Sequence, residues 1–383
     1  MRLFRSQKLI RPDLQAHIHS QALLDNVAAL KSLTPAAAKF CAVIKANAYG
    51  HGIAETVNII KNIDVDFFAV SSIYEALHIE PMLANQSILI LEPLHTAQPT
   101  DHFGLCAKKR FHCVISSLDA MAHAASQLAS TKHILDCHVN VESGMGRNGL
   151  APADAAKLIA DIDACPNMRL AGVFTHFATA DEEDLTYAYA QLATFKNFLK
   201  ENALDDRKDV IVHAANSAAT IKMPEAHFDM VRCGISMYGY YSRPMTDPPI
   251  TLKPVMKLQA PIVAIKPIPA GQPVSYGCSF NTTRDTTAAI VPLGYADGYW
   301  RCFSNKATML LGSSQVPVIG RVCMDQLLVD ITDAPQAEIG QMVTIIDNDH
   351  ASPCSAYALA ALAGTICYEI LICVHAHVNR IVH

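Results

Sequence analysis

Lys45 is the residue of this 383-residue chain whose surroundings most strongly indicate chemistry. It follows Phe40–Ile44, an apolar and largely β-branched run typical of a buried strand, and Asn47 and the pair Gly50/Gly52 indicate a loop directly after it. An ammonium buried without a partner is costly. Burial also lowers the pKa of an amine, which makes it a nucleophile for Schiff-base formation. Because a lysine at such a position is more often a surface residue, other motifs must support a catalytic role.

Four further polar residues follow later apolar runs in the same way. Arg147 lies in Gly144-Met-Gly-Arg-Asn-Gly149, whose glycines allow a ligand to approach the backbone, and His176, Ser217 and Arg232 each follow another predicted strand. A single histidine there is by default a hydrogen-bonded core residue. Several cations together are harder to explain, since burying unpaired charges costs several kcal/mol. A bound anion is the simplest explanation.

The elements that carry these residues alternate in type. Eight strands are predicted, each followed by a helical stretch or a loop, over Phe40–Ile44, Phe67–Val70, Ile88–Leu91, His112–Ile115, Leu135–Val141, Leu170–Phe174, Val210–Val212 and Met230–Arg232. This alternation predicts an α/β fold, either a (β/α)8 barrel or a doubly wound sheet. Polar residues at several strand ends favour the barrel, which we place at residues 13–245.

The second part of the chain, residues 246–383, has a different sequence pattern. Prolines cluster from Pro244 to Pro273, and strand-like runs follow at regular spacing with few helices before Ala356–Leu362. We therefore predict a mainly β domain, which residues 1–12 are expected to join.

Composition excludes several classes of function. Hydrophobic residues make up 51% of the chain, charged residues 17%, and the formal net charge is −5, so no basic face for nucleic acid is expected. No apolar run is long enough for a membrane span, and no signal peptide begins the chain, so we predict a cytoplasmic protein. The 12 cysteines include no C-x-x-C pair, and we predict no metal site.

The run Ala42-Val-Ile-Lys-Ala-Asn-Ala-Tyr-Gly-His-Gly52 resembles the pyridoxal 5'-phosphate (PLP) motif of alanine racemases, and further motifs follow in the family's order almost to the end of the chain. The resemblance implies a PLP-dependent racemase with a (β/α)8 barrel and a β domain. Its substrates would be L- and D-alanine, its D-alanine would serve peptidoglycan, and it would work as a head-to-tail homodimer with shared active sites.

The resemblance also assigns roles to individual residues. Lys45 would bind PLP and act as one base, and Tyr276 of the partner subunit would be the other. The remaining cofactor-binding positions would be Tyr49, Arg147, His176, Ser217, Arg232, Gly234, Ile235 and Tyr368; the substrate would contact Arg147 and Met324; and Tyr295, Asp181, Arg301 and Arg321 would lie at or support the entrance.

Racemisation needs a base on each face of the substrate Cα, and lysine and tyrosine, with ordinary pKa values near 10, must both be tuned. We expect His176 and Arg232 to form a cationic chain that favours the Tyr276 phenolate. Arg232 would face the pyridine nitrogen, where most PLP enzymes place a carboxylate that protonates the ring. An arginine would leave that nitrogen unprotonated and limit transamination.

Asn140 departs from the pattern of many family members, which carry a carbamylated lysine seven residues before the motif arginine. A neutral asparagine cannot replace that negative charge. We therefore expect either a bound chloride beside Asn140 and Arg147 or a neutral hydrogen bond.

Three other functions share part of this sequence pattern with alanine racemisation. A racemase of the same fold acting on serine, lysine or a broad range stays open, because the motifs do not fix the size of the pocket. A non-catalytic PLP-binding barrel would lack Tyr276 and the β domain. A decarboxylase of related architecture would place an acid, not Arg232, at the ring nitrogen.

Overall fold

A computed structural model describes residues 10–97 and 101–383 of the chain. Its first large element is a parallel sheet of eight strands in the order β8-β7-β6-β5-β4-β3-β2-β9. The strands are β2 (Lys39–Val43), β3 (Phe67–Val70), β4 (Ser87–Ile90), β5 (His112–Ile115), β6 (Leu135–Asn140), β7 (Met168–Phe174), β8 (Ile211–His213) and β9 (Met230–Cys233). All eight lie within two residues of the predicted runs at both ends.

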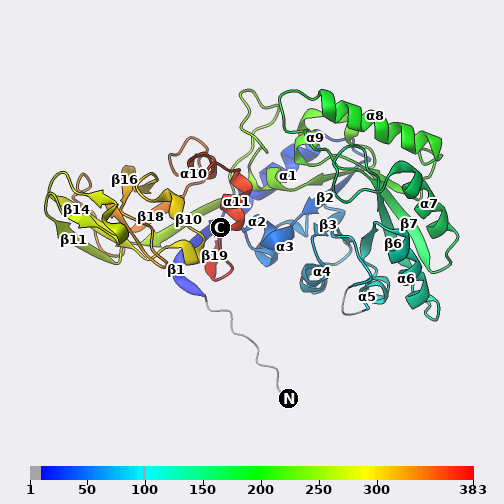
Figure 1. Cartoon of the computed structure of the whole chain (residues 1–383), viewed down its shortest axis with the longest axis horizontal. Helices are drawn as coiled ribbons and strands as arrows, with labels where there is room; N and C mark the ends of the chain where they lie inside the picture. Colours follow the sequence, from blue (N-terminus) through cyan, green and yellow to red (C-terminus); the bar gives the residue numbers. More distant parts are fainter. Residues whose placement is uncertain (1–9, 98–100) are drawn as a thin grey trace, which may run out of the picture.

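Backbone hydrogen bonds close this sheet into a barrel. The amides of Asp229 and Arg232 donate to the carbonyls of Val212 and Ala215, which joins the two edge strands. Helices follow the strands and pack on the outside (Figure 1). They are α1 (Ser20–Ser32), α3 (Ile53–Ile60), α4 (Ile73–Ile79), α5 (His102–Lys109), α6 (Leu118–Leu128), α7 (Pro152–Asp163), α8 (Thr186–Glu201) and α9 (Ser217–Lys222). The predicted barrel, rather than a doubly wound sheet, is confirmed.

The second sheet has nine strands in the order β11-β14-β17-β16-β15-β18-β10-β1-β19. Its members are β1 (Arg11–Ile18), β10 (Met256–Pro261), β11 (Ala264–Ile268), β14 (Thr286–Val291), β15 (Thr308–Leu311), β16 (Ser314–Ile319), β17 (Leu327–Asp330), β18 (Met342–Ile346) and β19 (Val378–Val382). A short hairpin of β12 (Pro273–Val274) and β13 (Phe280–Asn281) extends from it, and α10 (Ala356–Ala363) and α11 (Cys367–Ile372) precede the last strand. The mainly β second domain is thereby confirmed.

The first strand belongs to this second sheet. β1 pairs antiparallel with β10 and parallel with β19, so residues 13–18, which we assigned to the barrel, lie with the C-terminal strands. The half-exposed pattern of a strand does not reveal which sheet it joins, because both sheets offer apolar faces. Residues 1–9 of the predicted lead-in lie outside the described residues.

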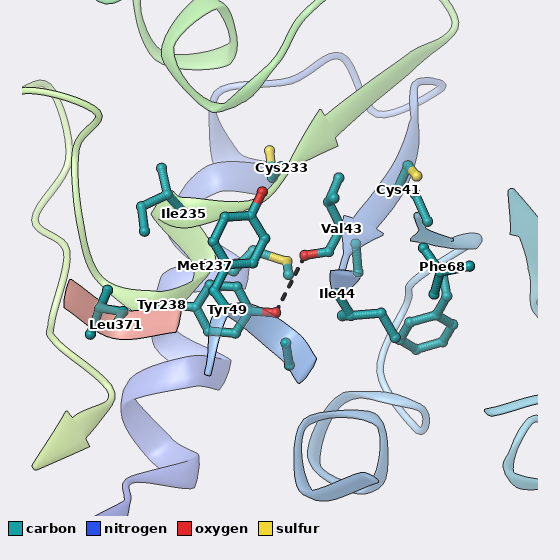
Figure 2. Packing of buried hydrophobic residues seen from close by; sticks show 14 of the residues in the cluster. Cys41, Val43, Ile44, Tyr49, Phe68, Cys233, Ile235, Met237, Tyr238 and Leu371 are labelled. Carbon is teal, nitrogen blue, oxygen red and sulfur yellow. Dashed lines mark hydrogen bonds between the residues drawn. The ribbon is translucent and has the colours of Figure 1, made fainter. Parts of the chain in front are cut away.

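One dense region of the core joins the carboxyl ends of β2 and β9 to helix α11. Figure 2 shows the rings of Tyr49 and Tyr238 between Val43 on one side and Ile235 and Leu371 on the other. The hydroxyl of Tyr238 donates to the carbonyl of Val43 at 3.3 Å. This packing fixes the backbone that immediately surrounds Lys45. Over the described ranges, no helix combines the length and apolar character needed to cross a membrane.

Candidate active site

A cavity of about 490 Å³ opens at the carboxyl ends of the barrel strands, where barrel enzymes place their chemistry. It is lined by polar and apolar residues of the barrel together with Tyr368 from helix α11. Every residue predicted to bind the cofactor is among them: Lys45, Tyr49, Arg147, His176, Ser217, Arg232, Gly234, Ile235 and Tyr368. Residues scattered over more than 300 positions of sequence thus converge on one space.

Lys45 follows strand β2 and is half-buried at the cavity wall. Burial lowers the pKa of its ammonium, the positive charge of Arg147 lowers it further, and Glu75 opposes both. A lowered pKa increases the fraction of free amine near neutral pH, which is the form that can attack a carbonyl or accept a proton.

The backbone after Lys45 makes a left-handed helical turn, α2 (Lys45–Tyr49). Ala46, Asn47, Ala48 and Tyr49 all have φ between 52° and 55°, a conformation that costs L-residues roughly 1–2 kcal/mol each. The turn is held by its surroundings: the amide of Ala46 donates to Glu75 Oε1 at 2.8 Å, and Asn47 Oδ1 accepts from the amide of Ile53 at 2.9 Å. Consecutive strained residues at one point of a stable fold are typical of a functional segment.

One end of the cavity is a cradle for an anion. Ser217 begins helix α9, and its hydroxyl accepts from the amide of Gly234 at 2.8 Å. A Cβ built at Gly234 would lie 2.4 Å from the Tyr49 hydroxyl, so only glycine allows that ring to approach. Burial raises the pKa values of the phenols of Tyr49 and Tyr368, which keeps them protonated as donors. Backbone amides and neutral hydroxyls of this kind suit a phosphate.

Arg232 is buried behind the cavity with no carboxylate paired to it among the described residues. Its guanidinium donates to His213 Nδ1 at 2.8 Å, to the carbonyls of Thr175 at 3.0 Å and Ala214 at 3.1 Å, and to His176 Nδ1 at 3.2 Å. Neutral acceptors therefore compensate the buried charge. Burial lowers the pKa of Arg232 to about 10, which still leaves it charged at neutral pH.

His176 differs from our expectation of a cationic chain. Burial, followed by the charges of Arg232 and Arg147, lowers its pKa to about 3, so the imidazole is neutral. It accepts a hydrogen bond from Arg232 instead of adding a second positive charge. The sequence could not indicate this, because it does not show that three cations share one wall.

The carboxylate of Glu142 holds the loop that carries Arg147 in place. This carboxylate accepts from the backbone amides of Gly144, Met145 and Gly146 at 2.5 to 2.9 Å. Burial acts to raise the pKa of Glu142, but these amides outweigh it and the pKa is lowered. The anchor was missed from the sequence, although a carboxylate just before a glycine-rich loop is a recognisable signal.

Two other contributions were also missed. Ser242 lines the cavity and forms a 2.8 Å hydrogen bond with the hydroxyl of Tyr368. Asn216 caps helix α9 by accepting from the amide of Ala219, which orients the helix start that carries Ser217. The contact of Ser242 has no local signal, since it and Tyr368 are 126 residues apart. Asn216 does have one, because an asparagine directly before a helix is a recognisable N-cap.

Tyr276 and Met324 do not line this cavity. Tyr276 is 71% exposed and Met324 58% exposed, and Tyr276 lines a separate cavity of about 660 Å³ in the second domain. The residue before Tyr276 is Ser275, with φ 63° and ψ −174°, a region of backbone space occupied almost only by glycine. Its hydroxyl donates to the carbonyl of Arg321 at 2.8 Å. Within one chain, the two predicted bases are therefore on separate surfaces.

The predicted entrance residues divide in the same way. Asp181 lies on the barrel side, 3.6 Å from Arg243. Tyr295 and Arg301 are exposed on the second domain, and Arg321 is half-buried beside Gly277.

The cavity fits PLP. Its anion cradle suits the phosphate, its amine can bind the aldehyde carbon, and Arg232 lines the same cavity. Lys45 would hold the aldehyde end, and Ser217, Tyr49, Tyr368 and the amides of Gly234 and Ile235 would hold the phosphate.

Comparison with known proteins agrees with this description. Residues 18–242 match the N-terminal domain of alanine racemase, and residues 255–382 match its C-terminal domain. An alanine racemase of Desulfosudis oleivorans is 36% identical over 96% of this chain and 95% of its own length. One from Treponema pallidum is 36% identical over 96% of this chain and 98% of its own length.

Solved structures give the same result. An alanine racemase of Clostridium difficile aligns with TM-score 0.89 and 33% identity over 98% of this chain and 96% of that chain. The enzyme of D-cycloserine-producing Streptomyces lavendulae aligns with TM-score 0.90 and 30% identity over 97% of both chains. With both domain models matched and relatives similar along nearly its whole length, this chain belongs to the alanine racemase family, whose members are PLP-dependent racemases.

Proposed function

We propose that this protein interconverts L- and D-alanine with Lys45 and Tyr276 as its two bases. The observation that carries the proposal is the convergence of all nine predicted cofactor-binding residues on one cavity around an amine of lowered pKa. The D-alanine formed would supply peptidoglycan. The twelve cysteines are all free thiols, in keeping with a reducing, cytoplasmic location.

Bound PLP supplies an electron sink for the charge that develops at the substrate Cα. Lys45 Nζ holds or accepts the proton on one face of that carbon, and Tyr276 Oη of the partner subunit serves the other face. Arg232 carries only donors, so it has no carboxyl proton to give to the ring nitrogen that it faces. Arg147 would contact the phenolic oxygen of the cofactor and the substrate, and the amide of Met324 of the partner subunit would receive the substrate carboxylate.

A test of the reaction is incubation of the PLP-loaded protein with L-alanine in D₂O. We expect optical rotation to fall to zero while deuterium enters at Cα. Deuterium without loss of rotation would mean that only one face is served, and the pair Lys45/Tyr276 would be wrong. Parallel incubations with L-serine and L-lysine test the broader specificity that the motifs leave open; equal rates would reject alanine as the preferred substrate.

We also propose a head-to-tail homodimer, in which each barrel cavity receives Tyr276 from the other subunit. Support comes from the exposure of Tyr276 and from its place on a cavity that shares no lining residue with that of Lys45. Mixing Lys45→Ala and Tyr276→Phe subunits tests this arrangement. If the sites are shared, each mixed dimer contains one intact site, and random exchange restores about a quarter of the wild-type activity. If each chain used its own tyrosine, no site would be restored.

We further propose that a chloride lies beside Asn140 and Arg147. Both residues line the cavity, and no carboxylate pairs with Arg147 among the described residues. Replacing chloride by gluconate should lower kcat/KM, and Asn140→Asp should make the enzyme independent of chloride by supplying the charge. Asn148→Asp, at a neighbouring exposed position of the same cavity, is the control and should stay chloride-dependent. Full activity without chloride in the wild-type protein, with only water at the site, would reject the proposal.

A further inference from the structure

Three histidines form a continuous line behind Arg232, through the interior of the barrel. His213 Nδ1 lies 2.8 Å from Arg232 Nη1, His213 Nε2 lies 2.9 Å from His138 Nδ1, and His138 Nε2 lies 3.0 Å from His112 Nδ1. His138 and His213 are fully buried, whereas His112 is half-buried at the first residue of β5. The line therefore runs from the cofactor face toward the amino ends of the strands.

The direction of every hydrogen bond in this line is fixed by Arg232. A guanidinium has only donors, so His213 must accept at Nδ1 and, as a neutral ring, carry its proton on Nε2. That proton can go only to His138 Nδ1, which places the proton of His138 on Nε2 and makes His112 Nδ1 the next acceptor. Aligned donors of this kind polarise one another and strengthen the bond at the arginine. Burial lowers the pKa values of His213 and His138 well below the ordinary value, which keeps both rings neutral.

The backbone is shaped to hold His138 in this line. The pairing of β6 with β7 shifts register between Cys137 and His138, an irregularity that re-aims a side chain. Opposite the ring is Gly172, where a Cβ would lie 2.3 Å from His138 Nδ1. Glycine inside a strand weakens it and often marks a close approach. The ring of Phe174 stacks on that of His213, with the ring centroids 4.8 Å apart and an angle of 8° between the ring planes.

We propose that His138 and His112 are positioning residues, which act through His213 to fix its tautomer and thereby hold the guanidinium of Arg232 toward the cofactor. The role in catalysis rests on the proposed racemisation, whereas the arrangement of protons does not. Without His138, the His213 Nε2 proton has no partner in the line, and the ring is free to carry its proton on Nδ1. In that tautomer, the N–H at Nδ1 of His213 would face an N–H of Arg232, and no hydrogen bond could form between them.

Neutron diffraction from the PLP-loaded protein in D₂O tests the arrangement directly. We expect deuterons on Nε2 of His213 and His138 and none on their Nδ1 atoms, with His112 Nδ1 also free of deuterium. A deuteron on Nδ1 of any of the three rings would overturn the proposal. This measurement is independent of turnover, so it tests the proton positions on the three histidines even if the protein racemises nothing.

Matched variants test the positioning role. His138→Phe removes both hydrogen bonds and should lower kcat about tenfold, with a smaller change in KM. His138→Gln retains an acceptor and a donor and should recover kcat to within about threefold. Gly172→Ala retains all three histidines but displaces the ring of His138, so its kcat should fall about as far as that of His138→Phe.

His102→Phe is the control for loss of a buried histidine, because His102 is buried in α5 outside the line. It should leave kcat unchanged. If His138→Phe and Gly172→Ala keep wild-type kcat and the wild-type tautomer of His213, or if His138→Gln is as impaired as His138→Phe, the positioning role is wrong. If the wild-type protein shows no racemisation, the proposed function fails, and the deuteron positions still decide the arrangement of the line.

Discussion

The two residues proposed as bases both stand beside strained backbone, but in opposite environments. The turn after Lys45 has four consecutive residues with positive φ and is packed against Tyr238 and helix α11. The loop of Tyr276 has positive φ at Ser275, Gly277 and Cys278, and all of it but Ser275 is exposed. Strain is therefore stored at both places, although the chain itself covers only one of them.

This difference indicates how the site is divided. The barrel side is held in place within one chain, because Arg232, Ser217 and Glu142 already have hydrogen-bond partners there. The second-domain side presents the hydroxyl of Tyr276 to the outside, where the proposed second subunit would cover it. Strain that persists at an exposed loop supports a function there.

Lys45→Ala gives the largest effect. It removes the only amine among the cavity-lining residues, so turnover should fall by at least about 10⁴-fold, together with loss of the absorption band of covalently held PLP. Lys39→Ala, at the exposed start of the same strand, is the matched control and should keep both the turnover and the absorption band of the wild type. Retained turnover in Lys45→Ala would show that the barrel side does not supply a base.

Tyr276→Phe tests the exposed side. Racemisation should fall by about 10²- to 10⁴-fold, the range expected for a general acid or base. Because the enantiomers have equal energy, kcat/KM must fall equally in both directions. Exchange of the Cα proton with D₂O should nevertheless persist for the one enantiomer whose proton faces Lys45.

Proton NMR of each enantiomer in D₂O measures that exchange. Loss of exchange for both enantiomers would mean that Tyr276 is needed for more than one face. Tyr74→Phe, at an exposed tyrosine of the barrel, should behave as wild type.

Gly50→Ala tests how tightly the turn of Lys45 is packed. Gly50 has φ 83°, and an added Cβ would lie 2.0 Å from the carbonyl oxygen of Leu371, so strain and a backbone clash combine. We expect a loss of about 3 kcal/mol in the free energy of unfolding. Gly271→Ala, at φ 78° with open space around it, should cost only about 1 kcal/mol. Urea denaturation measures both losses. Equal losses in the free energy of unfolding would show that the surroundings of Gly50 are packed no more tightly than those of Gly271.

The barrel was predictable because buried parallel strands appear as continuous apolar runs. Each of the eight runs, such as His112–Ile115, was found close to its observed bounds. Helix α5 has a weak signal in the sequence, because His102, Lys108 and Lys109 interrupt its apolar face. The strand-like run Val255–Ile265 of the second domain is two strands in the structure, because the chain pairs with β1 and β18 up to Pro261 and with β14 from Ala264.

The site was predictable only in part. The resemblance supplied the cavity residues, but neither the left-handed turn nor the neutral state of His176 has a signal in the sequence, since both depend on packing by distant segments. The same holds for His138 and His213, 75 residues apart and adjacent only in the barrel. The roles assigned to Tyr276 and Met324 remain predictions, because they depend on a second subunit.

Replacement of His51 gives the smallest expected effect. It tests whether the packing around Lys45 limits the stability of the protein in acid. Its ring is fully buried, stacks on Tyr238 at 4.4 Å and donates from Nδ1 to the carbonyls of Ala48 and Tyr49, which belong to the left-handed turn. Burial lowers its pKa from 6.5 to about 3. Below pH 6.5 the unfolded chain binds a proton that the folded protein refuses, so stability is lost as the pH falls toward 3.

Between pH 7 and pH 5 this one group should cost about 2 kcal/mol of the free energy of unfolding. His51→Asn keeps a donor near the position of Nδ1 but cannot titrate, so urea denaturation at the two pH values should show a pH-dependent loss smaller by about that amount. His133→Asn, at an exposed histidine, should leave the pH dependence as in the wild type. An unchanged acid loss in His51→Asn would mean that water or a proton reaches this packing in the folded state, and the barrel side would then be less closed than its contacts indicate.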